Sequence, residues 1–300
     1  MILEQTTLVL ISTSIAFIGC LIAAITDFKW GIVPDKLNYA LIALGAIMVL
    51  MRFELWNALA VYGIAIAVFV LGLLAYLFGQ LGGGDVKFFA ALTLLLPFYP
   101  KEIAALSPLN PMINIPYPFI VSVFFTSAVL AVFFVSLSYL WMFWRDRKQI
   151  KNLKQTAMKG ALYFFLVTIP LTLLWGSINQ LVLVVIIPIA LGAFLLPFKN
   201  ILLEKYISQE KKVKDLDDDD VLAIELMSEE TKEKLGLSSR KTFLNIELKS
   251  LKEKAREHGI ETVPVSENLP KFVPYIFIAL VINLLLGDAF LWMLSQSIIS

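Results

Sequence analysis

Gly82-Gly83-Gly84-Asp85-Val86-Lys87 places an aspartate between two strongly apolar stretches, residues 56–78 and 86–97. A charged side chain in membrane-like sequence is energetically costly, so it indicates a functional residue with a partner elsewhere in the chain. The three glycines lack a Cβ atom and let the backbone bend and approach a neighbouring segment closely. This stretch therefore predicts a turn between two membrane segments, with Asp85 as the first candidate functional residue.

Asp27 is the best candidate partner for Asp85, because it directly follows the first apolar stretch, residues 7–26. His258 is the one histidine of the chain and lies in a charged region, and Cys20 is the one cysteine. This composition excludes Ser-His-Asp and Cys-His catalysis, multi-histidine metal sites, and disulfides within one chain. Two carboxylates at the ends of membrane helices therefore predict an intramembrane aspartyl protease.

The composition is that of a multi-pass membrane protein. Of 300 residues, 59% are hydrophobic and the mean hydropathy is +0.80, whereas an ordinary soluble domain is about 45–50% apolar. A bilayer span needs roughly 20 apolar residues, and the stretches that reach or approach this length are 7–26, 37–51, 56–78, 86–97, 119–144, 160–175, 181–197 and 272–294. The sequence therefore predicts an all-α, polytopic membrane helix bundle of about six to eight transmembrane helices.

Two of these stretches carry further expectations. The first has no basic flank and no small-x-small cleavage site, so we expect it to remain as a membrane helix rather than be removed as a signal peptide. The stretch 86–97 is short for a full crossing, so we expect neighbouring helices to shelter it from lipid.

Basic residues orient the predicted helices. The loop 145–159 holds six Lys or Arg residues against Asp146 alone, so the positive-inside rule places it in the cytoplasm. Counting spans back from this loop puts Asp27 and Asp85 near the cytoplasmic face of the cell membrane. The predicted parts of the chain are a membrane protease core (1–145), a basic loop with an additional transmembrane hairpin (146–197), a cytoplasmic polar subdomain (198–271) and a C-terminal transmembrane helix (272–300).

The polar subdomain holds 14 basic and 16 acidic residues, and this balanced charge, interrupted by apolar residues, is not that of a disordered tail, so we expect a small helical subdomain. Helices are expected over 221–235 and 239–258, the second with Ser239 as N-cap and Gly259 just beyond its end. Its apolar stripe at helical spacing is Leu244, Leu248, Leu251 and Ala255. The four aspartates 217–220 fit a solvated helix start better than a cation site. The net charge of +1 indicates no nucleic-acid partner.

Other interpretations of the two aspartates stay open at this point. Asp85 could cap the helix that follows it, since it stands between glycines and an apolar run. Asp27 could simply end the first span, and the glycines could form a hinge. A polar-cavity transporter or channel could also use Asp27 and Asp85 as cation sites next to a glycine-broken helix. A membrane scaffold would leave both carboxylates dispensable.

The motifs resemble those of a known family. Gly82-x-Gly84-Asp85 resembles the GxGD signature of membrane aspartyl proteases, and the string through Lys87 resembles the GxGDxK form of type IV prepilin peptidases and archaeal preflagellin (pre-archaellin) peptidases. The resemblance implies catalytic roles for Asp27 and Asp85, and motif roles for Gly82, Gly84 and Lys87. Further family-like features are Asp35, which is an acidic alternative in the following loop, and the ending with Pro264, Pro270, Pro274 and Gly287-Asp288.

The archaeal branch is the closer match, since the bacterial enzymes typically add a cysteine-bearing domain and a methyltransferase activity, which we do not expect here. The additional hairpin 160–197 departs from the usual six-helix core. Presenilin-like proteases normally carry a Tyr-Asp pair and a Pro-Ala-Leu motif. Here Thr26 precedes Asp27 and the sequence has no Pro-Ala-Leu, so this relationship is disfavoured.

The resemblance implies an endopeptidase that needs neither cofactor nor metal and that cleaves class III signal peptides from preflagellin or prepilin precursors. In such an enzyme two nearby carboxylates share one proton. The ionised carboxylate accepts a proton from water while the protonated one polarises the scissile carbonyl. Cleavage at the cytoplasmic boundary would agree with the orientation derived from the basic residues.

Overall fold

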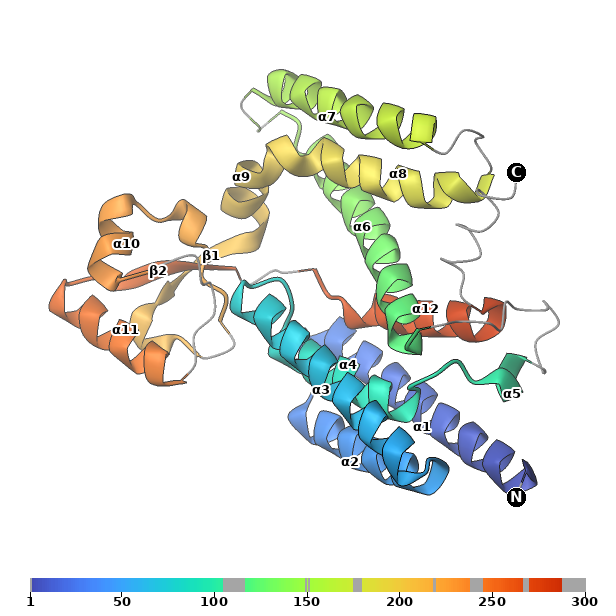
Figure 1. The fold of residues 1–300 in the computed structure, drawn as a ribbon. Coiled ribbons are helices and arrows are strands. Elements are labelled where there is room, and N and C mark those ends of the chain that lie inside the picture. Colours follow the sequence, from blue (N-terminus) through green and yellow to red (C-terminus); the bar gives the residue numbers. More distant parts are fainter. Residues whose placement is uncertain are drawn as a thin grey trace. The chain divides into compact units, whose positions relative to one another are not determined.

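The computed structural model describes residues 2–104, 117–148, 150, 152–174, 180–217, 220–237, 245–266 and 270–287. The chain forms two compact units (Figure 1). The first comprises Met1–Ile66, Lys87–Phe198 and Lys271–Ser300, and the second comprises Ala67–Val86 and Lys199–Pro270.

Every predicted apolar stretch contains a helix. The helices are α1 (Ile2–Trp30), α2 (Asp35–Arg52), α3 (Leu55–Leu77), α4 (Gly83–Leu95), α6 (Phe119–Arg145), α7 (Leu153–Leu174), α8 (Gln180–Leu195) and α12 (Val273–Leu286), with the one-turn helix α5 (Lys101–Ala104) between α4 and α6. In the first unit, α1 packs against α2 and α12, α6 packs against α12 and α8, and α7 packs against α8. The part of the last predicted span beyond Gly287 lies outside the described residues.

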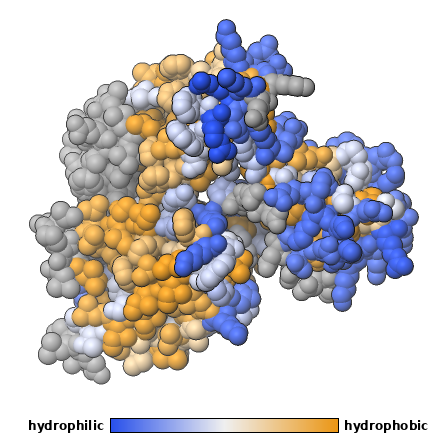
Figure 2. Space-filling view, turned by 180° about the vertical axis from the view of Figure 1, so that it is seen from behind, coloured by the Kyte–Doolittle hydropathy of each residue, from blue (hydrophilic) through white to orange (hydrophobic). Residues whose placement is uncertain are grey.

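Five helical segments of the described chain are long and apolar enough to cross a membrane: Gln5–Trp30, Leu55–Leu77, Phe119–Arg145, Leu153–Leu173 and Val185–Ile207. Large apolar side chains lie exposed along these helices, and Figure 2 shows broad hydrophobic areas on the surface. Examples are Trp56, Ile66, Leu71, Leu166 and Leu173. Exposed apolar patches of this kind indicate contact with lipid. The predicted fold class, an all-α polytopic membrane bundle, is confirmed.

Helix α4 is the most buried of the membrane segments. Every residue from Phe88 to Leu96 is buried, which confirms that neighbouring helices shelter this short stretch. Two glycines allow the close packing. A Cβ atom on Gly45 of α2 would lie 2.7 Å from the Cβ of Leu94, and one on Gly72 of α3 would lie 2.8 Å from Cγ1 of Val86. Small residues are the usual means by which membrane helices approach each other closely.

The second unit contains two strands that the sequence did not predict. β1 (Ser208–Lys212) pairs antiparallel with β2 (Thr262–Ser266), in a register that joins Ser208 to Ser266 and Lys212 to Thr262. Val263 and Val265 are buried and alternate with less buried neighbours, which is the period of a half-buried strand. The short helical turns of this unit are α9 (Lys199–Leu202) and η2 (Leu203–Ile207) before β1, and η3 (Val213–Asp215) and η4 (Ile224–Leu226) after it, while η1 (Leu196–Phe198) ends the second segment of the first unit.

The first helix predicted for this unit is shorter than expected. Residues 221–228 are not α-helical, and α10 begins only at Glu229 and ends at Leu235. The hydroxyl of Ser228 accepts a hydrogen bond from the Thr231 N–H, so Ser228 caps α10 and fixes where it starts. Before this cap, Leu222 pairs with Val265 as a β-bridge, and this pairing replaces the predicted helix.

The second predicted helix, α11 (Asn245–Glu257), is confirmed over the residues that the structure describes. Leu248, Leu251 and Ala255 are buried in the core of this unit, as the stripe predicted, whereas Leu244 and Ser239 lie outside the described residues. Gly259 has φ +66°, and the N–H of Ile260 donates to the Ala255 carbonyl. This is the Schellman arrangement that ends helices at a glycine.

Candidate functional site

Asp85 lies in the first turn of α4, at its third residue, and Gly84 at its second. Its Oδ2 atom accepts a hydrogen bond from the Gly82 N–H at 3.2 Å, and the Gly82 carbonyl accepts one from the Val86 N–H. Gly82 is therefore the capping residue, and Asp85 binds back to it as the third residue of a capping box does. The alternative in which Asp85 is itself the N-cap is wrong.

Glycine at position 82 keeps space free beside this carboxylate. A Cβ atom there would lie 3.2 Å from Oδ2 of Asp85, which is closer than ordinary van der Waals contact. The Asp85 carboxylate also lies at the positive end of the α4 dipole, which favours a negative charge. The backbone of the glycine turn therefore lies close to the Asp85 carboxylate.

Asp27 is buried, with 6% of its surface exposed, and lies within the last turn of α1 rather than after the helix as predicted. Its Oδ2 atom accepts a hydrogen bond from the Val273 N–H at 3.1 Å. Val273 is the first residue of α12, whose start has no side-chain cap of its own. A carboxylate at the end of α1 is opposed by the dipole of that helix, but it is favoured at the start of α12.

Lys271 adds a positive charge at the same place. Its ammonium group attracts the Asp27 carboxylate electrostatically and donates a hydrogen bond to the Phe28 carbonyl. It also lies 5.7 Å from the centre of the Phe28 ring. Sequence reasoning missed Lys271 and Val273 as neighbours of Asp27. Pro274 indicated where α12 begins, but no local pattern pairs that start with the end of α1.

Lys87 has a defined partner within the first unit. Its Nζ atom lies 2.6 Å from Oδ1 of Asp35 and 5.4 Å from the centre of the Tyr39 ring. Asp35 is the first residue of α2 and does not lie in the preceding loop as predicted, and Tyr39 follows one turn later. The structure thus brings together the GxGDxK lysine and the acidic residue that the sequence offered as an alternative.

The predicted catalytic residues fall in different units, Asp27 in the first and Asp85 in the second. No group of three or more His, Cys, Asp and Glu side chains in the described part of the chain could hold a metal ion. In the run of aspartates 217–220, Asp220 forms an ion pair with Lys211, whose Nζ atom lies 2.7 Å from Oδ2 of Asp220. Residues 218 and 219 lie outside the described residues.

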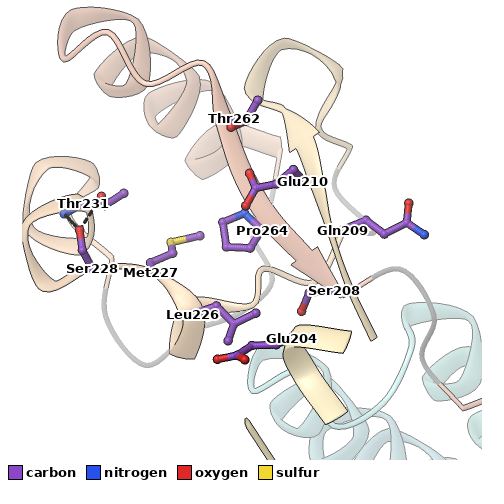
Figure 3. Close-up of a pocket in the computed structure, with 10 residues that line it drawn as sticks. All are labelled: Glu204, Ser208, Gln209, Glu210, Leu226, Met227, Ser228, Thr231, Thr262 and Pro264. Atoms are coloured by element: carbon purple, nitrogen blue, oxygen red, sulfur yellow. Dashed lines mark hydrogen bonds between the residues drawn. The ribbon is translucent and has the colours of Figure 1, made fainter. Parts of the chain in front are cut away.

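The second unit has a pocket of about 540 Å³ (Figure 3). Polar and apolar side chains line it, and the residues are Glu204, Ser208, Gln209, Glu210, Leu226, Met227, Ser228, Thr231, Thr262 and Pro264. Within it the Ser228 hydroxyl accepts the Thr231 N–H of the α10 cap, and the hydroxyls of Ser228 and Thr231 form a second hydrogen bond at 2.8 Å. None of the sequence-predicted site residues lines this pocket, so the candidate site stays with the membrane helices.

Comparison with known proteins agrees with the motifs. Residues 14–140 match the type IV leader peptidase family. Two curated archaeal proteins, each described as prepilin peptidase EppA, are similar to the chain. The protein from Methanothermobacter thermautotrophicus is 29% identical over 149 residues, which is 48% of this chain and 38% of the relative. The protein from Methanocaldococcus jannaschii is 29% identical over 152 residues, which is 51% of this chain and 40% of the relative.

The matched part of the chain spans about two fifths of the length of these relatives. No solved structure matches the chain. The resemblance to the type IV prepilin peptidase family is confirmed, and the family match over residues 14–140 includes Asp27, Asp35, Asp85 and Lys87.

Proposed function

We propose that this chain is a membrane aspartyl endopeptidase that removes class III signal peptides from prepilin-type precursors at the cytoplasmic membrane boundary. The observation that carries the proposal is the family match over 14–140, because it spans both Asp27 and the glycine turn of Asp85. The names of the two relatives favour a prepilin-type substrate, and preflagellin is the alternative within the same class.

In the proposed mechanism, Asp27 and Asp85 come together around one water molecule. Two carboxylates that close cannot both ionise easily, so the pair holds one proton. The ionised member accepts a proton from water, which attacks the scissile carbonyl, and the protonated member donates a hydrogen bond to that carbonyl oxygen. The amide of Val273 and the glycine-rich turn support the proposal, since each leaves its carboxylate anchored by a backbone donor.

The family match also bears on the transporter alternative. A cation site would use the same two carboxylates, but it would give no reason for the GxGDxK string or for the likeness to peptidases. We therefore place the peptidase first and keep ion transport as an outcome that the experiment can detect.

The test is cleavage of purified prepilin and preflagellin precursors by the full chain in proteoliposomes. Asp27→Asn and Asp85→Asn preserve side-chain size and remove the charge, so each is expected to lower cleavage at least about a thousandfold, as loss of an essential catalytic group does. Glu54→Gln and Asp215→Asn are matched controls, because both acidic groups are exposed and lie apart from the motifs.

Active controls together with two inert aspartate variants would support the mechanism. If either aspartate variant cleaves like the native chain, the two-aspartate mechanism is refuted. If the native chain leaves competent precursors uncut but carries a cation current that Asp85→Asn abolishes, the transporter alternative replaces it.

A further inference from the structure

Lys87 and Asp35 join the starts of two helices that lie 52 residues apart in sequence. Asp35 opens α2, and Lys87 stands in the first turns of α4, two residues after Asp85. The ammonium group is held on two sides, by the carboxylate at 2.6 Å and by the face of the Tyr39 ring at 5.4 Å. A charge-assisted hydrogen bond together with a cation–π contact holds the Lys87 side chain in one preferred conformation.

The start of α4 needs such an anchor because it has few side chains of its own. Gly82, Gly83 and Gly84 offer no side chain to pack, and glycine costs the most conformational freedom when it is ordered. Val86 is the first buried side chain after them, and Lys87 forms an ion pair with Asp35 of α2. From Phe88 to Leu96 every residue is buried, whereas Gly83, Gly84 and Asp85 at the start of the helix are only partly buried.

We propose that the Asp35–Lys87 ion pair, backed by Tyr39, is a positioning clamp that holds the first turn of α4 and thereby orients the Asp85 carboxylate for peptide cleavage. The inference rests on the proposed function, since it assigns Lys87 and Asp35 to the orientation of a catalytic aspartate. Neither residue is assigned a contact with substrate.

Because the Asp35–Lys87 pair is partly exposed, its effect on the position of Asp85 can be measured separately from its effect on the stability of the fold. The side chains of Lys87 and Asp35 are 28% and 56% exposed, and ion pairs this exposed contribute little to folding. Breaking the pair should therefore leave the chain folded and inserted while the catalytic geometry loosens. Misplacing a catalytic group by about 1 Å can cost on the order of a hundredfold in rate.

The experiment compares Asp35→Asn, Lys87→Gln and the charge-swapped double variant Asp35→Lys/Lys87→Asp, which restores an ion pair of the same combined length. We expect each single variant to lower kcat at least about tenfold with KM changed less than about twofold, because the loss concerns orientation rather than substrate binding. The swapped variant should recover to within about threefold of the native kcat, since it restores the pair. Lys36→Gln is the matched control, because Lys36 is exposed beside Asp35.

A second measurement does not depend on peptidase activity. With the sole cysteine, Cys20, changed to alanine, a nitroxide attached at Leu81→Cys reports the motion of the glycine turn. We expect Lys87→Gln to increase the mobility of this label and the charge swap to restore it. If mobility follows the pair while Asp85→Asn still cleaves normally, the pair holds the glycine turn, but the two-aspartate mechanism fails and with it the role of the pair in cleavage.

Two results would overturn the clamp. Unchanged label mobility in both single variants would show that the pair does not hold the turn. A swapped variant that regains the native mobility but stays as inactive as Lys87→Gln would show that the lysine charge acts directly on the reaction rather than through position.

Discussion

Gly45→Ala tests whether α2 and α4 pack as closely as the structure has them. The added Cβ atom would lie 2.7 Å from the Cβ of Leu94 and 3.3 Å from the backbone nitrogen of Leu95. Neither atom is the free end of a flexible side chain, so the two helices must separate by about 0.7 Å to reach ordinary contact near 3.4 Å. Overpacking of this kind costs about 1–3 kcal/mol in the free energy of unfolding.

Alanine also favours helix over glycine, and this gain offsets at most about 1 kcal/mol of the cost. Gly63→Ala measures the gain alone, because a Cβ atom at Gly63 of α3 would meet nothing within 4 Å. We expect Gly45→Ala to be less stable than Gly63→Ala by about 1–3 kcal/mol. The assay is thermal unfolding of the purified chain in detergent, followed by tryptophan fluorescence.

The close packing of α2 and α4 is refuted if Gly45→Ala unfolds at the same temperature as Gly63→Ala or above it. The result also bears on the site, since α4 carries Asp85 and Lys87. A Gly45→Ala chain that is destabilised should lose cleavage activity as well, whereas Gly63→Ala should retain it.

Three further variants test single contacts. Gly82→Ala should lower precursor cleavage without changing membrane insertion. Its Cβ would lie 3.2 Å from Oδ2 of Asp85 and displace the carboxylate from the backbone N–H of residue 82. Cleavage at the native rate would contradict the capping geometry. Lys271→Met should lower cleavage, because it removes the positive charge that attracts the Asp27 carboxylate, whereas Lys29→Met at the exposed end of α1 should not. Equal cleavage rates for the two variants would show that Lys271 does not contribute to the site. Leu251→Ala should destabilise the second unit by about 2–5 kcal/mol, seen as faster limited proteolysis, while the exposed control Glu253→Ala should leave the rate unchanged.

The membrane helices could be predicted from sequence because apolar length is a local property. All eight stretches contain a helix, and the burial of 86–97 followed from its length alone. The strands of the second unit could not be predicted in the same way. β1 reads Ser-Gln-Glu-Lys-Lys, which has no β-branched or aromatic residue, and it forms a strand only because the distant residues 262–266 pair with it.

The same division holds for the candidate site. Asp85 could be found because three glycines precede it in sequence, and Asp27 because it stands near the end of an apolar run. Their surroundings could not be found, since Val273 lies 246 residues from Asp27 and Lys87 lies 52 residues from Asp35. No spacing rule links residues so far apart, and only the packed helices bring their polar groups into hydrogen-bonding range.

The hydrogen bond between Asp27 and Val273 indicates that the protease core needs residues from beyond the first 145. Sequence patterns placed the core in residues 1–145, and the family match ends at 140. Yet the buried carboxylate of Asp27 takes a hydrogen bond from the start of α12, and Lys271 supplies the neighbouring positive charge. A buried carboxylate that loses its donor costs more than the hydrogen bond contributed, because its desolvation is no longer compensated. The chain must therefore return from its polar segment to the membrane helices, and residues 271–273 complete the surroundings of Asp27 as much as α1 does.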